Sequence, residues 1–209
     1  MGFYPIALEL EGRPCLVVGG GAVAERKVEA LLEAGARVTV VSPTVTPHLA
    51  SWAHEGKIHR VARAWERGDL AGHALVFVAT DDGAVNAEVA SEGRRGGVWV
   101  NAADDPDHCD FILPSVLRRG ALTVTVSTGG TSPALARAIR EELEAYLTDD
   151  YATLASIAAE ARREVRAAGK PVTAEAWRRA LGPEVRRLIV ERGRDDAKHR
   201  LLELLGVES

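Results

Sequence analysis

Apolar residues in the first part of the chain occur as short continuous runs at residues 16–18 and 75–79 and in the mostly apolar segment 37–41, which also holds Arg37 and Thr39; longer segments of mixed character separate them. Continuous apolar runs are typical of parallel strands that helices cover on both faces. Two intervening segments, residues 22–34 and 83–95, carry apolar side chains at helical spacing. The alternation of strands and helices predicts a doubly wound α/β sheet, whose ligands bind at the carboxyl ends of the strands. Further elements are predicted as a helix at 45–55 and strands at 58–62 and 98–100.

The first apolar run leads directly into a glycine-rich turn, Gly19 to Ala24, that opens a helix. Gly19 permits the tight turn, Gly21 lets the backbone approach a pyrophosphate, and the small Ala24 lets the helix lie close to the strand. The amides of the first helical turn and the positive end of the helix dipole favour phosphate there. The pattern predicts a βαβ unit that binds a dinucleotide, with contacts from Gly19, Gly21, Ala22, Val23 and Ala24.

The end of the second predicted strand leaves the type of dinucleotide open. NAD-binding proteins commonly place an acidic residue there, but no Asp or Glu occurs between Ala36 and Ala53. The first arginine after that strand, a residue expected near the 2′-phosphate of NADP, is Arg60. A plain strand-ending turn explains the same residues equally well. The residues predicted to contact the ribose are Ser42, Pro43 and Thr44.

Two more polar segments follow buried strands and are predicted to share the same edge of the sheet. Thr80 and Asp81 come after the strand at 75–79, and residues 101–110 follow the strand at 98–100. We expect Thr80, Asp81 and Asn101 to contact the cofactor. An aspartate in the second segment is suited to act as a general base, although aspartates also favour solvated turns. The adjacent residues of its His-Cys-Asp run, 108–110, cannot converge on one ion without strain, so no metal site is predicted.

The pattern changes after residue 110. Residues 111–114 and 121–127 are predicted to be antiparallel strands joined through 115–120, because the second segment alternates apolar and polar positions. A second glycine-rich turn then opens a helix to about Leu147, with Ser132 as N-cap and Pro133 at its first position. This turn is suited to receive a carboxylate, or it is only a capped turn. From Thr148 the chain is predicted to be helical, with breaks at 169–171, 182–183 and 193.

Composition places the chain among ordinary globular proteins, with 46% hydrophobic and 27% charged residues in 209. It contains no apolar run long enough to span a membrane and no basic N-terminal leader, so a cytoplasmic location without membrane contact is expected. Residues 151–209 carry 12 Lys and Arg against 9 Asp and Glu, whereas residues 1–150 carry 14 against 21. This basic excess indicates either solvated helix faces or a surface that faces a polyanionic ligand. Nucleic acid is not expected, because no aromatic residues interleave with the arginines.

Several separated motifs together resemble precorrin-2 dehydrogenase, the dehydrogenase family of siroheme synthesis. The resemblance spans residues 1 to about 147, and beyond Leu147 it rests only on a helical tail of suitable length. The chain has Thr128 where family members often have serine, so the hydroxyl is kept and a methyl group is added. The motifs that carry this resemblance are Gly19 to Lys27, Ala79 to Asp82 with Val85-Asn86, Asn101 with Asp104 and Pro106, Phe111 to Ser115, and Ser127 to Pro133.

The resemblance implies oxidation of precorrin-2 to sirohydrochlorin, with NAD⁺ as hydride acceptor and Asp104 as the catalytic aspartate. It implies a homodimer built from a Rossmann-type NAD-binding domain at 1–112, a small α+β dimerisation segment at 113–147 and a helical C-terminal domain at 148–209. Standalone relatives differ in iron insertion, so that second activity stays open. Two alternatives are an NAD(H)-sensing regulatory module without catalysis and a reductase for a smaller substrate. The residues expected to bind the tetrapyrrole are Ser127, Thr128, Gly129, Gly130, Thr131 and Ser132.

Overall fold

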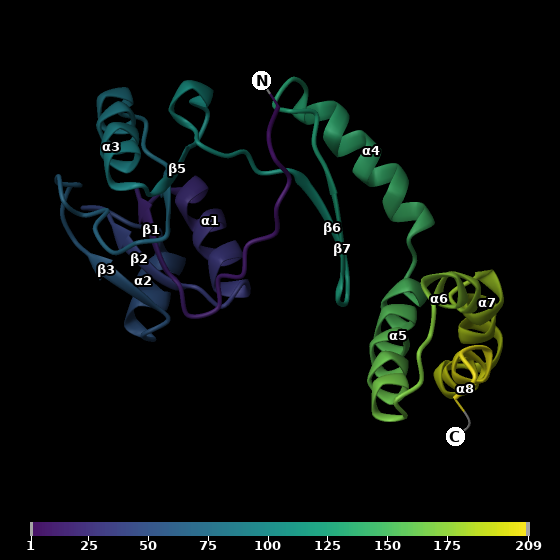
Figure 1. The fold of residues 1–209 in the computed structure, drawn as a ribbon. Helices are drawn as coiled ribbons and strands as arrows, with labels where there is room; N and C mark the ends of the chain where they lie inside the picture. Colours follow the sequence, from purple (N-terminus) through teal and green to yellow (C-terminus); the bar gives the residue numbers. More distant parts are fainter. Residues whose placement is uncertain (1, 208–209) are drawn as a thin grey trace. The chain divides into compact units, whose positions relative to one another are not determined.

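The computed structural model describes residues 2–207 and divides the chain into two compact units, Met1–Ile112 and Leu113–Ser209 (Figure 1). The first unit is built on a parallel sheet of five strands in the order β3-β2-β1-β4-β5. The predicted α/β fold, with a helical C-terminal region, is confirmed. The strands are β1 (Pro14–Val18), β2 (Arg37–Val41), β3 (Ile58–Val61), β4 (Leu75–Val78) and β5 (Trp99–Ala102).

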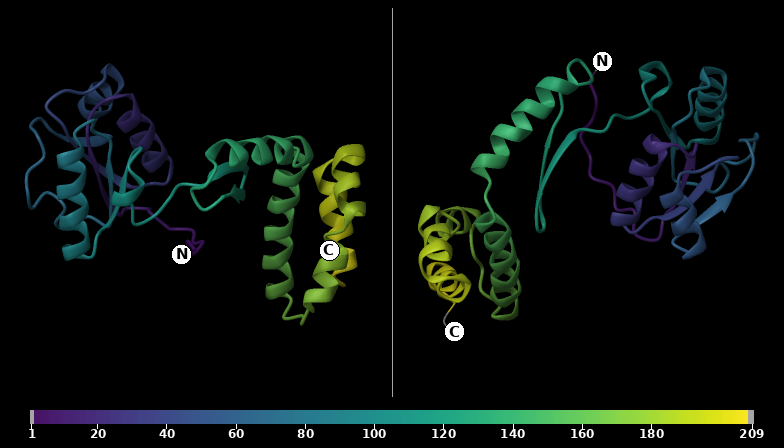
Figure 2. Two further views of the ribbon diagram at one scale, coloured as in Figure 1. Left: turned by 90° about the horizontal axis from the view of Figure 1, so that it is seen from above. Right: turned by 180° about the vertical axis from the view of Figure 1, so that it is seen from behind.

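Helices cover both faces of this sheet, as the views of Figure 2 show. The helices are α1 (Ala22–Glu33), α2 (Pro47–His54) and α3 (Gly83–Gly96), with a short 3₁₀ turn η1 (Pro106–His108). On one face, α1 and α2 pack their apolar side chains on alternate strand residues such as Val17 and Val40. On the other face, α3 packs on the intervening residues, such as Leu16 and Val76. Both faces of the central strands are therefore buried, which explains why their sequences are continuously apolar.

Over its described residues, 113–207, the second unit contains an antiparallel hairpin and five helices. The strands β6 (Ser115–Arg119) and β7 (Leu122–Val126) pair in a register that sets Arg119 opposite Leu122. Helices α5 to α8 enclose a core centred on Ile157, Val185 and Leu201. The breaks predicted in this region are confirmed. The helices are α4 (Pro133–Tyr146), α5 (Asp150–Ala167), α6 (Ala174–Ala180), α7 (Pro183–Arg192) and α8 (Arg194–Leu204).

The predicted position of the first hairpin strand was wrong. Residues 111–114 are not a strand, and residues 115–119, predicted as the link, form β6. Phe111 is apolar because it packs edge-on against Phe77, with ring centroids 5.6 Å apart. Pro114 has no N–H to donate to a strand ladder. Gly120, with a φ of +56°, opens the two-residue loop between β6 and β7, where hairpins favour glycine.

Within residues 2–207, no helix is long and apolar enough to cross a membrane.

Candidate dinucleotide and catalytic site

The carboxyl ends of β1 and β4 lie side by side at the centre of the sheet, where the strand order reverses. The chain runs from β1 outward through β2 to β3 and then crosses to β4 on the other side of β1. Ligands of open α/β sheets bind in the crevice at such a reversal. The amide of Ala79 donates to the carbonyl of Val18 (2.8 Å), and the amide of Gly19 donates to that of Val41 (3.0 Å). These bonds fix the start of the two loops that border the crevice.

Gly19 allows those two loops to meet. Its φ is +116°, and a Cβ atom at this position would lie 2.2 Å from the carbonyl oxygen of Ala79. The motif predicted that Gly19 permits the tight turn, and the structure shows in addition that the backbone of Ala79 approaches it closely. A side chain at residue 19 is therefore incompatible with the turn for two independent reasons.

Gly20 has a structural role, although the dinucleotide motif gives roles only to Gly19, Gly21 and Ala24. A Cβ atom on Gly20 would lie 2.0 Å from the carbonyl oxygen of Thr44 and 2.8 Å from Oγ of Ser42. The amide of Thr46 donates to the carbonyl of Gly20 at 2.9 Å. The loop after β2 thus packs directly on the glycine turn. The unbroken run of three glycines was the sequence signal for this contact.

Gly21 is different, because nothing lies within 4 Å of the place where its Cβ would be. It is the N-cap of α1, and no side chain caps that helix end. Gly21 and Ala22 are exposed, Val23 is half-buried and Ala24 is buried against the sheet. The turn therefore presents a helix N-terminus with open space in front of it, as a pyrophosphate requires.

The predicted ribose residues have different surroundings. The hydroxyl of Ser42 is buried and donates to the carbonyl of Thr44 at 2.6 Å. Thr44 is exposed, and its hydroxyl forms no hydrogen bond to residues 2–207. Arg60, on β3, donates from Nη2 to the carbonyl of Pro43 at 3.0 Å, while its Nε is buried without a partner in the described part of the chain. The sequence identified Arg60 only as the first arginine after β2, and the parallel register sets it opposite Val40, at this turn.

Glu25, in the first turn of α1, holds the loop after β2 in place. Its carboxylate accepts hydrogen bonds from the hydroxyl of Thr46 and from Nδ1 of His48, and these bonds lower the pKa of Glu25. Thr46 in turn caps α2 by accepting a bond from the amide of Leu49. The position of the predicted ribose contacts is thus tied to the helix that follows the glycine-rich turn.

The segment after β4 is organised by two side chains. Asp82 caps α3 by accepting from the amides of Ala84 and Val85, and the hydroxyl of Thr80 bonds the backbone of Asp82. Asp81 is exposed and forms no hydrogen bond or ion pair within residues 2–207. Asp81 is therefore free to face a ligand, whereas Asp82 is used to start the helix.

The segment after β5 uses most of its polar groups internally. Asn101 is buried and donates from Nδ2 to the carbonyl of Phe111 at 2.8 Å, so its amide closes the loop. Asp105 bonds His108 at 2.8 Å, and Asp110 accepts from the amide of Val100 at 2.9 Å. Cys109 donates to the carbonyl of Ala102, and burial raises the pKa of its thiol. Within residues 2–207, no three His, Cys, Asp or Glu side chains converge as a metal site.

Unlike Asp107, whose carboxylate is also unbonded, Asp104 combines a free carboxylate with an unusual backbone conformation. It is exposed, and its carboxylate forms no hydrogen bond or ion pair with the described residues. It is also the one non-glycine residue with a positive φ, +58°, in the part of the chain that the structure describes. Such a conformation is uncommon and occurs more often at functional sites than elsewhere. The loop therefore holds a free carboxylate in a fixed place after β5, next to the switch point.

Lys27 supplies a positive charge on the same side of the sheet. Its Nζ lies 5.3 Å from the centre of the Phe77 ring. Burial lowers the pKa of Lys27 and the charge of Arg26 lowers it further, whereas the negative charge of Asp104 raises it. A half-buried ammonium group thus lies within the electrostatic reach of Asp104. Sequence reasoning missed this residue, because its place on the helix face that meets β4 depends on packing.

The second glycine-rich turn, in the other unit, is held by its own hydroxyl groups. Thr128 exchanges hydrogen bonds with the backbone of Ser132, and Thr131 donates to the carbonyl of Thr128. Ser127 accepts from the amide of Gly129, and Ser132 caps α4 by accepting from the amide of Leu135, as predicted. Gly129 and Gly130 both have a positive φ, and nothing surrounds them within 4 Å. The capped turn is present, and tetrapyrrole binding by these six residues stays a prediction.

Comparison with known proteins adds three findings. A family model described as putative NAD(P)-binding matches residues 6–115, and one described as sirohaem biosynthesis protein central matches residues 119–146. Siroheme synthase of Methylococcus capsulatus is 42% identical over 97% of this chain and 43% of its own length, and siroheme synthase 1 of Aeromonas salmonicida is 40% identical over 100% and 45%.

A solved structure described as SirC, precorrin-2 dehydrogenase, superposes with a TM-score of 0.72. It is 27% identical and covers 98% of this chain and 99% of its own. The chain thus spans less than half of these two curated relatives but nearly all of this structural relative.

Proposed function

The chain belongs to the family of putative NAD(P)-binding proteins. From this family, the match to the sirohaem central model and the similarity to a precorrin-2 dehydrogenase structure, we propose that it oxidises precorrin-2 to sirohydrochlorin with NAD⁺ as hydride acceptor, in siroheme synthesis. Membership of the family confirms the resemblance that the motifs predicted. The observation that carries the proposal is the free carboxylate of Asp104, held at a positive φ beside a turn suited to a pyrophosphate. A nucleotide sensor has no need of such a carboxylate.

The residues of the turn fit a dinucleotide. The open space at Gly21 and the uncapped start of α1 suit the pyrophosphate, and the hydroxyl of Thr44 is free for a ribose. When bound, NAD⁺ supplies a two-electron acceptor for the hydride. The overall reaction takes one hydride from a ring carbon and one proton from the macrocycle, and yields NADH and sirohydrochlorin.

Asp104 is proposed to take the proton. A carboxylate without an internal hydrogen-bond partner keeps its lone pairs available to the substrate, and the loop holds the backbone of this residue at a positive φ. Asp105 and Asp110 are less suited to this task, because their carboxylates already accept bonds within the loop. The family resemblance and the hydrogen-bond pattern therefore favour the same aspartate.

Anaerobic incubation with precorrin-2 tests the proposal. With NAD⁺, we expect the absorbance of sirohydrochlorin and of NADH to rise together, and with NADP⁺ more slowly. A parallel reaction with Fe²⁺ and sirohydrochlorin decides whether the chain also inserts iron as a second substrate. Binding of NAD⁺ without any turnover of precorrin-2 would instead favour the NAD(H)-sensing module.

Replacing Lys27 by Met tests whether its charge supports the ionised carboxylate of Asp104. We expect kcat/KM for precorrin-2 to fall roughly five- to tenfold, because a positive charge within the electrostatic reach of Asp104 is lost. Lys27→Arg keeps the charge and should retain the native rate. Steady-state rates at pH 7 provide the measurement. An unchanged kcat/KM in Lys27→Met would show that the cation acts only in packing against Phe77.

We also propose that residues 113–147 mediate a homodimer. A two-stranded hairpin is marginally stable alone, and β6 and β7 each leave one edge unpaired within residues 2–207. Helix α4 exposes Leu135 and Tyr146, which are 52% and 65% accessible. Sedimentation equilibrium of the full chain should give twice the monomer mass. A monomer at micromolar concentration would contradict this assignment.

A cytoplasmic location is proposed for the same enzyme. Both cysteines are free, Cys15 in the core and Cys109 in the loop after β5, which suits a reducing compartment. Localisation of a tagged full chain by cell fractionation tests this.

A further inference from the structure

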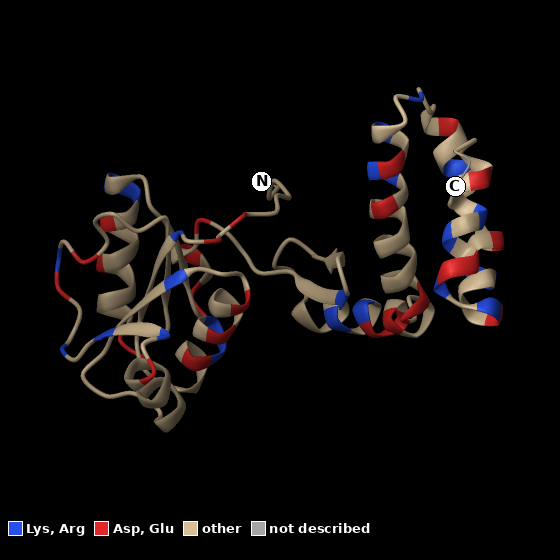
Figure 3. Cartoon of the chain, turned by 90° about the horizontal axis from the view of Figure 1, so that it is seen from below, with Lys and Arg blue, Asp and Glu red and all other residues tan. Residues whose placement is uncertain are grey.

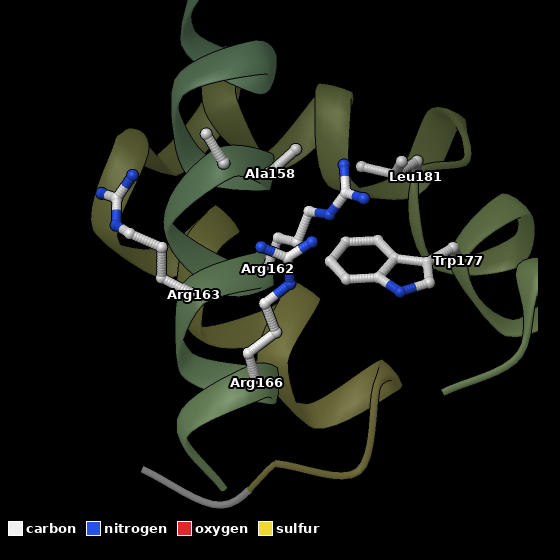
Figure 4. A pocket seen from close by; sticks show the side chains of 7 residues that line it. Ala158, Arg162, Arg163, Arg166, Trp177 and Leu181 are labelled. Atoms are coloured by element: carbon white, nitrogen blue, oxygen red, sulfur yellow. The ribbon is translucent and has the colours of Figure 1, made fainter. Parts of the chain in front are cut away.

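The helical region contains a hollow of about 620 Å³ between α5 and α6. Small side chains of α5 form part of its wall and leave space above the helix, and the indole of Trp177 on α6 forms the opposite side (Figure 4). The lining residues are Ala158, Ala159, Arg162, Arg163, Arg166, Trp177 and Leu181.

The three arginines of this hollow are unneutralised. The side chains of Arg162, Arg163 and Arg166 form no hydrogen bond or ion pair with residues 2–207. The acidic residues of the same helix are paired: Glu160 and Glu164 are bound by cations of α8, and Asp150 is bound by Arg186 of α7. Both signs of charge occur along these helices (Figure 3), but α5 separates them, so that its acidic residues are paired and its arginines are not.

Two of the arginines point toward the aromatic ring. Figure 4 shows the guanidinium groups of Arg162 and Arg166 beside Trp177, whereas Arg163 points to the other side of α5. Arg162 and Arg166 are four residues apart and therefore lie one above the other on the helix, about 6 Å apart at Cβ. Trp177 is half-buried and packs on the core of the helical region, so its ring is held in place.

We propose that this hollow binds a planar polycarboxylate, with the carboxylates on Arg162 and Arg166 and the flat ring system against Trp177. Guanidinium groups bind carboxylates through paired, charge-assisted hydrogen bonds, and an indole offers a face for stacking. Two cations separated along a helix suit a ligand with several carboxylates around a flat ring better than a single compact anion. The inference rests on the proposed function, since the tetrapyrrole substrate and its product are ligands of this class.

The binding test uses sirohydrochlorin as the probe and equilibrium dialysis of the full chain. The variant R162E/R166E should bind at least about tenfold more weakly, because two charge-assisted contacts become repulsive. The control R178E/R192E removes the same charge from exposed arginines that lie outside the hollow and have no ion pair within residues 2–207. It should keep the native Kd. If both variants bound sirohydrochlorin equally weakly, the effect would come from net charge alone, and the proposed site would be overturned.

A second measurement concerns the aromatic side of the hollow. Among the four tryptophans, Trp177 is the one in the helical region, so W177F should remove part of the fluorescence quenching by sirohydrochlorin and weaken binding. Unchanged quenching and Kd in W177F would overturn the stacking. Inorganic phosphate at constant ionic strength should not displace the probe, and displacement would show a simple anion site instead.

Failure of the site and failure of the proposed function give different results. If the native chain oxidises precorrin-2 but R162E/R166E keeps its native Kd for sirohydrochlorin and its native KM for precorrin-2, the site is wrong and the function stands. If the native chain binds sirohydrochlorin through these arginines without oxidising precorrin-2, the site stands and the function is wrong.

Discussion

Replacing Asp104 by Asn is expected to lower kcat for precorrin-2 oxidation roughly 100- to 10,000-fold, the range that a positioned proton acceptor contributes. Asn is the appropriate substitute because it tolerates a positive φ, so that the loop keeps its conformation. Alanine would add backbone strain and confuse the loss of a carboxylate with a loss of loop structure. The Kd for NAD⁺ should stay native. Stopped-flow or steady-state formation of sirohydrochlorin, with nucleotide binding measured separately, checks both expectations.

Asp107→Asn is the matched control for this experiment. Asp107 lies in the same loop, is exposed, and its carboxylate has no bonding partner among the described residues. Its φ is not positive, and nothing in the loop fixes its side chain. We expect native kcat in Asp107→Asn. A variant Asp104→Asn that kept native kcat would remove Asp104 from the mechanism, and equal losses in both variants would indicate a general effect of loop charge.

Replacing Gly19 by Ala is expected to destabilise the first unit by roughly 3 kcal/mol or more. The strained φ alone contributes about 1–3 kcal/mol, and the added methyl group collides with the carbonyl of Ala79. The midpoint of thermal unfolding should fall by roughly 10 °C, as expected for a chain of this size. Thermal and chemical denaturation followed by circular dichroism provide the measurement.

Gly21→Ala is the informative comparison, because the same methyl group meets no atom of the protein within 4 Å. The unfolding midpoint should change little, whereas the Kd for NAD⁺ should rise about tenfold, since the methyl group occupies the approach of the pyrophosphate. Native NAD⁺ affinity in Gly21→Ala would place the dinucleotide elsewhere. Loss of stability equal to that of Gly19→Ala would contradict the open space seen at residue 21.

These two glycines show which part of a motif follows from local rules. The tight turn at Gly19 and the open helix start at Gly21 were predictable, because strand, turn and helix are neighbours in the chain. The contact of Gly20 with the loop after β2 was not, because it depends on where residues 42–44 pack. Similarly, Ser42 looked like a free hydroxyl in sequence, but the fold buries it and directs it to the carbonyl of Thr44.

At the hairpin, the sequence predicted an element that the structure does not contain. The apolar run from Phe111 to Leu113 indicated a strand at 111–114, but Phe111 is apolar because it packs on Phe77. The true strand β6 carries arginines at its end, which weakened its pattern. Short apolar runs do not distinguish a strand from a loop that covers a core, since both bury the same kind of surface.

The sequence by itself determined the order of strands and helices, the glycine-rich turn before α1, the helical region and the family, because these depend on periodicity and on residues close together in the chain. Only the tertiary structure decided which polar groups remain free. It bonded Asp105 and Asp110 within their loop and left Asp104 unbonded, set Lys27 near that carboxylate, and brought Arg162 and Arg166 beside Trp177. The reason is physical: whether a polar side chain is available to a ligand depends on the neighbours that packing supplies, and those neighbours come from distant parts of the chain.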